Sequence, residues 1–122
     1  MLNSKLYKMK ENLIQEKTFE FALIIIEIYK KMIGQNEYVL SKQLLRSGTS
    51  IGANVEEAIA GISKKDFTAK MSISSKEARE TSYWLRLIEK SNIVDVNVAS
   101  AMQEVNSIIN ILTKIVKTSQ GK

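Results

Sequence analysis

The chain has 122 residues, a formal net charge of +5 at pH 7 and a sequence pI near 9.4. It contains no cysteine, histidine or proline, which excludes disulfides, thiol and imidazole catalysis and zinc-thiolate sites, and which leaves long helices possible. The longest apolar run, between Phe19 and Tyr29, carries Glu27 and is too short to span a bilayer. We expect a soluble cytoplasmic protein without a cofactor, whose positive charge suits a polyanionic partner.

The first half of the chain predicts a polar arm followed by two helices. The arm covers about residues 1–11, and the first helix runs from about Asn12 to Ile33 and ends at Gly34. Asn36 can cap the second helix, which continues to about Ala60.

The second half predicts two more helices and a short polar tail over 118–122. Ser63 and Asp66 have the spacing of a capping box and open the third helix, which ends near Ser91. Asp95 or Asn97 caps the fourth helix. Short connections make consecutive helices antiparallel neighbours. The sequence therefore predicts a single all-α domain over 1–122, an antiparallel up-down-up-down four-helix bundle.

Apolar residues at three- and four-residue spacing predict which face of each helix forms the core. In the second helix this stripe consists of Leu40, Leu44, Ile51, Val55, Ala58 and Ile62. In the fourth helix it consists of Val98, Met102, Val105, Ile109, Leu112 and Val116.

The first helix carries more apolar residues than one core face needs. Between Phe19 and Ile33 its only charged residues are Glu20, Glu27, Lys30 and Lys31. A helix that is apolar around most of its circumference must be covered on a second side. We therefore expect self-association into a homo-oligomer through one flank of this helix. The alternative is a centrally placed helix in a monomer.

Gly48 and Gly52 lie one turn apart in the second helix, and small residues recur at the same spacing in the third. An antiparallel pairing of these helices places Gly48 opposite Ala78, which predicts a close helix crossing. The glycines lower helix propensity by roughly 1 kcal/mol each. A local kink at Gly52 is the alternative explanation.

A polar row borders the apolar stripe of the second helix, where half-buried side chains should find partners. Arg46 lies near the level of Glu80 on the third helix and could form a charge-assisted hydrogen bond. We predict a polar network or interface, within or between subunits, formed by Arg46, Ser50, Asn54, Glu57, Glu77 and Glu80. The alternative is a solvated face.

The same residues carry a resemblance to a known family. The second helix contains Ser50, Ile51, Asn54 and Glu57, and the third contains Glu77, Ala78, Glu80, Thr81, Tyr83, Trp84 and Leu85. Over Leu40 to about Ile93 the chain resembles the four-helix-bundle proteins encoded in intervening sequences of bacterial 23S rRNA genes. It is more distantly similar to the accessory variability proteins of diversity-generating retroelements.

This resemblance implies a homopentameric barrel of antiparallel bundles with no established catalytic activity. By analogy with the retroelement proteins, it also implies association with nucleic acid and with a reverse transcriptase. The chain departs from the family pattern at Gly52, where proline is frequent, and at Ala58, where glycine is frequent.

Basic residues of the third helix gather on the arc opposite its apolar stripe, with one tyrosine among them. Such a surface can follow phosphates and stack bases, and a ring would repeat it in every subunit. We predict an RNA- or DNA-binding stripe formed by Lys65, Lys76, Arg79, Tyr83, Arg86 and Lys90. The alternative is an ordinary lysine-rich face that contacts only solvent.

Two other functional classes are less well supported. A hydrolase would need Glu56, Glu57, Glu77 and Glu80 to converge on a divalent ion, and nothing in the sequence fixes that convergence. A module that binds a protein partner or a membrane surface would use the first helix, which lacks a broad cationic face. The favoured hypothesis is a non-catalytic scaffold or adaptor that assembles with itself, binds no metal and does not bind membranes.

Overall fold

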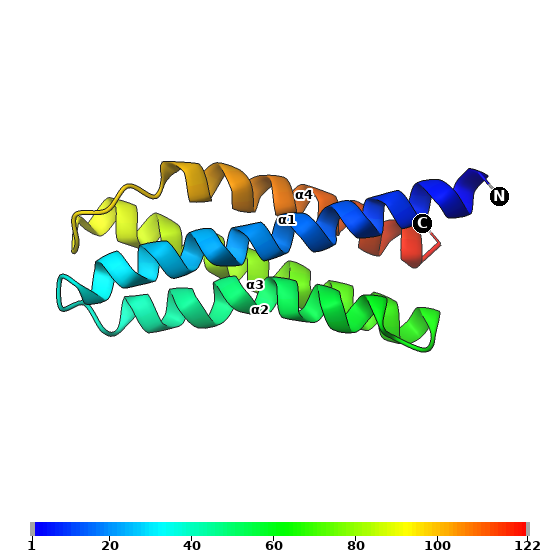
Figure 1. The fold of residues 1–122 in the computed structure, drawn as a ribbon, viewed down its shortest axis with the longest axis horizontal. Coiled ribbons are helices and arrows are strands. Elements are labelled where there is room, and N and C mark those ends of the chain that lie inside the picture. The colour runs from blue at the N-terminus through cyan, green and yellow to red at the C-terminus, as the bar shows by residue number, and fades with distance from the viewer. Residues whose placement is uncertain (1, 122) are drawn as a thin grey trace.

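The computed structural model describes residues 2–121 and, for residues 2–4, 6, 7 and 10, the backbone alone. Four helices make up this part of the chain: α1 (Leu2–Ile33), α2 (Leu40–Ile59), α3 (Lys64–Ser91) and α4 (Ala99–Ser119). Figure 1 shows the chain reversing direction at each of the three loops. The predicted all-α four-helix bundle is confirmed.

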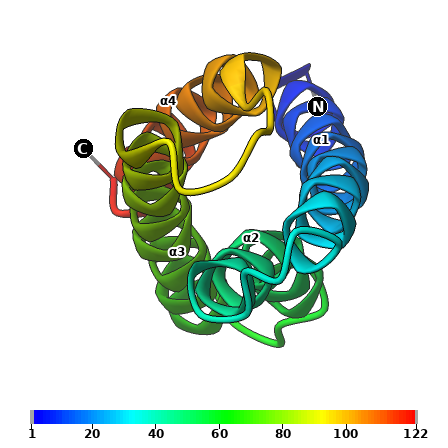
Figure 2. The ribbon, with the colours of Figure 1, turned by 90° about the vertical axis from the view of Figure 1, so that its left-hand side faces the viewer.

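The helices stand at the corners of a square, seen end-on in Figure 2. Each helix contacts the next along the chain, and α4 returns to contact α1. Among the described residues, no backbone contact joins the diagonal pairs, α1 with α3 and α2 with α4. The outward sides of α1 and α3 therefore point in opposite directions.

Each helix contributes one stripe to a continuous apolar core. Its largest fully buried side chains include Phe21, Ile25 and Met32 from α1, Leu44 and Ile51 from α2, Met71 and Leu85 from α3, and Ile108 and Leu112 from α4. Residues of this size, each removed from water, contribute about 1.5–3 kcal/mol apiece to folding.

Two stripe predictions are partly wrong. Ile62 is almost fully exposed because α2 ends at Ile59, and the residue lies in the loop that follows. In α4, Ile109 is only half-buried, whereas its neighbour Ile108 is fully buried. Adjacent isoleucines fit either of two helical faces, and contact with α1 and α3 decides between them.

The first helix begins much earlier than Asn12. It starts at Leu2, so the predicted polar arm is helical, and Figure 1 shows it projecting past the other three helices. Residues 2–11 contain no proline or glycine to stop the helix. At the other end of the helix, the predicted stop before Gly34 is confirmed.

The start of α2 is capped by Glu37 rather than by the predicted Asn36. The Glu37 carboxylate accepts hydrogen bonds from the backbone N–H groups of Val39, Leu40 and Ser41, at 3.1, 3.0 and 2.7 Å. Asn36 instead adopts a left-handed conformation with φ of 65° in the turn that follows α1. Asparagine tolerates this region better than most residues.

The predicted Ser63 cap is confirmed, and Asn97 acts at the start of α4 from one position before Val98, the N-cap residue. The Ser63 hydroxyl accepts a hydrogen bond from the backbone N–H of Asp66 at 3.0 Å. At the start of α4, the Asn97 side chain accepts one from the backbone N–H of Ala99 at 3.0 Å. Each satisfies a backbone donor that the first turn of a helix leaves without a partner.

The two loops at one end of the bundle are joined by a side-chain amide. Gln35 donates to the backbone carbonyl of Asp95 at 2.8 Å and accepts from its backbone N–H at 2.7 Å. This reciprocal pair ties the α1–α2 loop to the long connection between α3 and α4, which both lie at the near end in Figure 2.

Glu37 makes the stability of the bundle depend on pH. Burial favours the neutral acid, but the backbone N–H donors of Leu40, Ser41 and Val39 outweigh it, so the pKa of Glu37 lies below its ordinary 4.5. The folded state therefore gains stability from this carboxylate above pH 4.5 and loses it as the pH falls through the lowered pKa.

We expect Glu37→Gln to lower the free energy of unfolding by about 1 kcal/mol at neutral pH, the usual value of an N-cap. Urea unfolding of both proteins across the acid range measures the difference, which should shrink well below pH 4.5. A difference that stays constant through this range would contradict a role for the ionised carboxylate.

Candidate interaction surfaces

The predicted basic stripe lies on the outward side of α3. Its five cationic residues and Tyr83 are all exposed. Arg79 donates a hydrogen bond to the Thr113 hydroxyl of α4 at 3.3 Å, which anchors it at the α3–α4 seam. The Arg86 guanidinium carbon lies 5.9 Å from the centre of the Tyr83 ring, within the range of a cation–π contact.

The carboxylates nearest the middle of this stripe point away from it. Glu77 and Glu80 of α3 both face Arg46 of α2. The only acidic residue of α4, Glu104, forms an ion pair with Lys17 of α1. The remaining acids of α3 lie near its two ends, in its first turn and beside Lys90. The centre of the α3–α4 side therefore carries exposed basic residues whose positive charge no neighbouring carboxylate neutralises.

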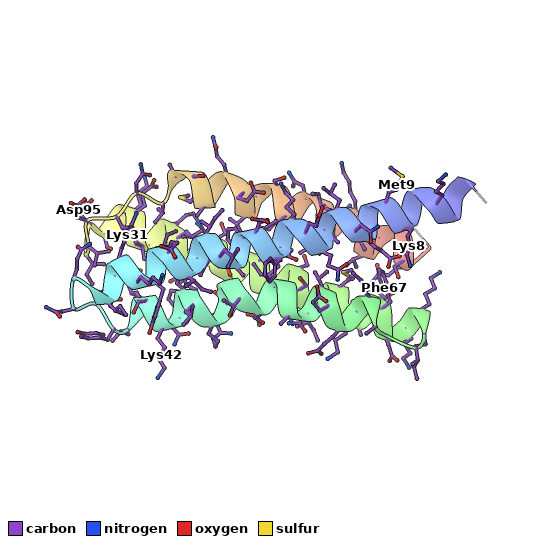
Figure 3. All side chains as sticks on the ribbon, in the orientation of Figure 1. Lys8, Met9, Lys31, Lys42, Phe67 and Asp95 are labelled. Carbon is purple, nitrogen blue, oxygen red and sulfur yellow. The ribbon has the colours of Figure 1, made fainter. Side chains whose placement is uncertain are left out.

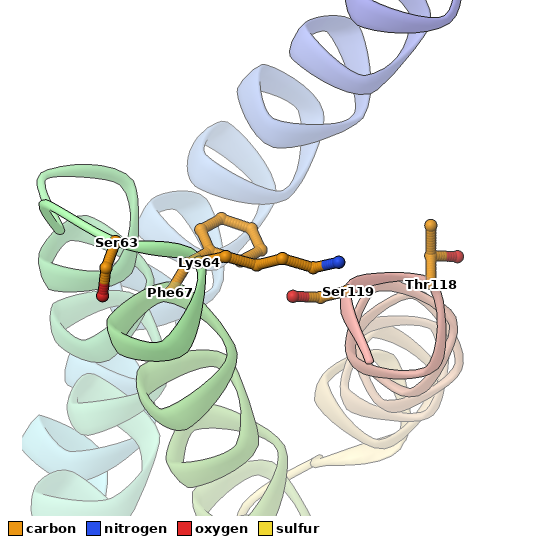
Figure 4. Close-up of a pocket in the computed structure, with 5 residues that line it drawn as sticks. All are labelled: Ser63, Lys64, Phe67, Thr118 and Ser119. Atoms are coloured by element: carbon orange, nitrogen blue, oxygen red, sulfur yellow. The ribbon is translucent and has the colours of Figure 1, made fainter. Parts of the chain in front are cut away.

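The structure adds residues that the sequence analysis did not include. Lys114 and Lys117 of α4 are exposed, and Lys117 belongs to the last turn. A hollow of about 380 Å³ lies between the start of α3 and the end of α4. Figure 4 shows the Lys64 side chain reaching across it toward Ser119. Only tertiary packing brings these two helix ends together, so helical periodicity alone could not have placed Lys64 here.

Arg46 links α2 to α3, as predicted. Its guanidinium lies 3.2 Å from a carboxylate oxygen of Glu77 and also contacts Glu80. The indole N–H of Trp84 donates to the same Glu80 carboxylate at 2.9 Å. All these contacts lie within one chain, so this part of the network fixes the pairing of α2 with α3.

The other predicted network residues form separate pairs. The Asn54 amide donates to the carbonyl and hydroxyl oxygens of Ser50, at 2.9 and 3.2 Å, one turn back on α2. Glu57 pairs with Lys70 of α3 at 2.7 Å. The six predicted residues therefore belong to three local groups rather than to one connected network.

Buried hydroxyls make a further polar link between α2 and α3. Thr81 donates to the Ser47 hydroxyl at 2.9 Å, and Ser74 donates to the backbone carbonyl of Ile51 at 2.8 Å. Both serines and Thr81 are buried. Small side chains at these core positions allow the hydrogen bonds to form between the helices.

The close crossing at the glycines lies against α1, which corrects the prediction that Gly48 faces Ala78. A Cβ placed on Gly48 would lie 2.8 Å from two side-chain carbons of Ile25, and one on Gly52 would lie 3.3 Å from the Thr18 carbonyl oxygen. Ala78 is a fully buried core residue of α3. The glycines therefore let α2 approach α1.

The four glutamates of the hydrolase hypothesis face different partners. Glu56 accepts a hydrogen bond from Gln15 of α1 at 2.8 Å, while Glu57 binds Lys70 and the other two bind Arg46. In residues 2–121, no group of three or more acidic side chains is arranged to hold a metal ion. Nor does any helix in this range combine the length and hydropathy needed to cross a bilayer.

α1 exposes large apolar side chains along its length. Met9, Leu13, Phe19 and Leu23 are all exposed, and Figure 3 shows Met9 on the projecting part of the helix, pointing away from the bundle. Phe19 is the most exposed of them, at 62%. Phe19 and Leu23 belong to the apolar surplus that the sequence indicated between Phe19 and Ile33, whereas Met9 and Leu13 lie before that span.

These features place the chain among small antiparallel four-helix-bundle proteins. A family model described as the 23S rRNA-intervening sequence protein matches residues 10–114. The chain therefore belongs to the 23S rRNA-intervening sequence protein family, which confirms the resemblance carried by α2 and α3.

Similarity to a solved structure supports the same family assignment. It is a protein with unknown function from the S23 ribosomal protein family of Bacteroides thetaiotaomicron VPI-5482, and it is 43% identical to this chain. The similarity covers 88% of this chain and 98% of that chain, with a TM-score of 0.83. No match was found among the curated proteins.

The close approach of α1 and α2 can be tested at Gly48. A methyl group there would gain about 1 kcal/mol of helix propensity but overpack Ile25, which costs about 1–3 kcal/mol. We expect Gly48→Ala to lower the free energy of unfolding, measured in urea. The loss should be smaller when Ile25 is also replaced by alanine; an equal loss in both backgrounds would contradict the contact.

Proposed function

We propose that the chain is a non-catalytic, self-assembling adaptor that binds RNA or DNA along α3 and the adjoining edge of α4. The observation that carries the proposal is the charge distribution of this side. Exposed lysines and arginines run along α3, and the nearby carboxylates between its end turns are held by Arg46 and Lys17.

The length of the stripe suits a polymeric ligand. Lys65 and Lys90 are 25 residues apart on one helix, which corresponds to about 37 Å at the α-helical rise. A row of cations over this distance can meet several successive phosphates. Tyr83, 48% exposed near the middle, offers a ring face for a base.

Self-assembly is the second half of the proposal. The exposed apolar residues of α1 lie at the corner of the bundle diagonal to α3, so an assembly formed through α1 leaves the basic stripes open. We infer a ring of five subunits, the number that the family resemblance implies. Repeated stripes would add weak contacts into stronger overall binding.

The nucleic-acid half is tested by replacing Arg79 and Arg86 with glutamate. Binding of a labelled RNA or single-stranded DNA, measured by fluorescence anisotropy over a series of salt concentrations, should weaken steeply with salt because bound phosphates release counterions. The double variant should bind at least about tenfold more weakly and with a shallower salt dependence, since charge contacts are lost.

The matched control replaces the same two arginines with lysine, which keeps both charges at the same positions. We expect this variant to retain binding and salt dependence close to those of the natural chain. Binding that ignores salt, or that survives the glutamate substitutions unchanged, would rule out the stripe. The bundle would then be better explained as a module for protein partners.

A further inference from the structure

We propose that a second copy of the chain docks side by side on α1, with its Phe19 seated in a hollow on the opposite flank of α1. The inference rests on the proposed self-assembly and adds the contact that forms it. It names the surface that each copy contributes, and these are two different flanks of α1.

The projecting half of the contact lies on the α2 side of α1. Phe19 lies beside a hollow of about 190 Å³ lined by the small residues Ala22, Thr49, Gly52 and Ala53 and by the polar residues Gln15, Thr18 and Glu56. Leu23, one turn further along α1, is also exposed. The Phe19 ring is 62% exposed, so it offers apolar surface to a partner.

The receiving half lies on the α4 side of the same helix. A hollow of about 390 Å³ is lined by Leu13, Glu16, Lys17, Glu20 and Ile24 of α1 and by Glu104 of α4. Leu13 and Ile24 supply apolar surface for an aromatic ring. Lys17 and Glu104 form an ion pair there, so each already has an opposite charge when water is displaced.

The two halves lie at the same level of the bundle. Phe19 falls within the span of α1, residues 13 to 24, that lines the receiving hollow. Two copies with the same orientation can therefore meet without sliding along their axes. A contact between unlike surfaces leaves each copy with one free surface of each kind, and such contacts close into a ring when the rotation allows.

α1 together with the flanking side of α2 is large enough for a stable contact. The 32 residues of α1 extend about 48 Å and the 20 residues of α2 about 30 Å, which at a width of about 10 Å per helix gives on the order of 800 Å². A standard interface takes about 800 Å² from each partner. Among the described residues, α2 and α4 expose no large apolar side chain, and α3 exposes only Ile73 and Tyr83.

The natural absence of cysteine permits a direct test. We would prepare Leu23→Cys, beside Phe19, and Glu20→Cys, at the receiving hollow, as separate proteins and treat each alone, and the two mixed, with a short bismaleimide cross-linker. Both positions are exposed, so the substitutions should leave the fold intact, and Phe19, Leu13 and Ile24 stay in place to form the contact. The mixture should form covalent dimers several-fold faster than either protein alone.

Tyr38→Cys mixed with Glu20→Cys is the matched control, because Tyr38 is 61% exposed but lies beyond the end of α1. It should give little dimer. Faster cross-linking of Leu23→Cys alone than of the mixture would overturn the inference, because a two-fold contact would then join identical surfaces.

Light scattering of the unmodified chain separates the two possible failures. If the chain is an oligomer but the mixture does not cross-link, this contact is wrong and self-assembly stands. If the chain is a single copy, self-assembly fails and the contact fails with it.

Discussion

A four-helix bundle can bury one face of each helix, and α1 carries apolar residues on more than one face. Its core stripe, with Phe21, Ile25 and Met32, fills the interior that the four helices enclose. Phe19 and Leu23 remain outside because no further element of the described chain lies over them. The apolar outward side of α1 can therefore be covered only by another molecule, and in the proposed assembly that molecule is a second copy of the chain.

The square arrangement of the helices separates two kinds of surface. Polar contacts such as Arg46 with Glu77 and Ser74 with Ile51 fix α2 against α3, and the glycines of α2 fix it against α1. With these positions set, the apolar corner at α1 and the basic corner at α3 lie on opposite sides. The proposed function uses both surfaces without requiring either to change shape, and the family assignment itself names no activity.

The sequence predicted the elements well because helical periodicity and local caps determine them. It also predicted the contact of Arg46 with Glu80, since antiparallel pairing fixes which levels meet. It misplaced Gly48, because a glycine at the edge of the apolar stripe can face either neighbouring helix, and only packing against Ile25 decides. Glu37 was missed because glutamate is an uncommon cap, and Ile108 because the adjacent Ile109 fits an equally regular stripe.

The most direct test of the account asks whether the outward side of α1 is covered in solution. Hydroxyl-radical footprinting of the natural chain would compare oxidation of Phe19 with that of Tyr83, which are 62% and 48% exposed in a single copy. The account predicts that Phe19 is oxidised much more slowly than Tyr83 in concentrated solution and gains reactivity on dilution. Phe19 oxidised as fast as Tyr83 at every concentration would contradict it.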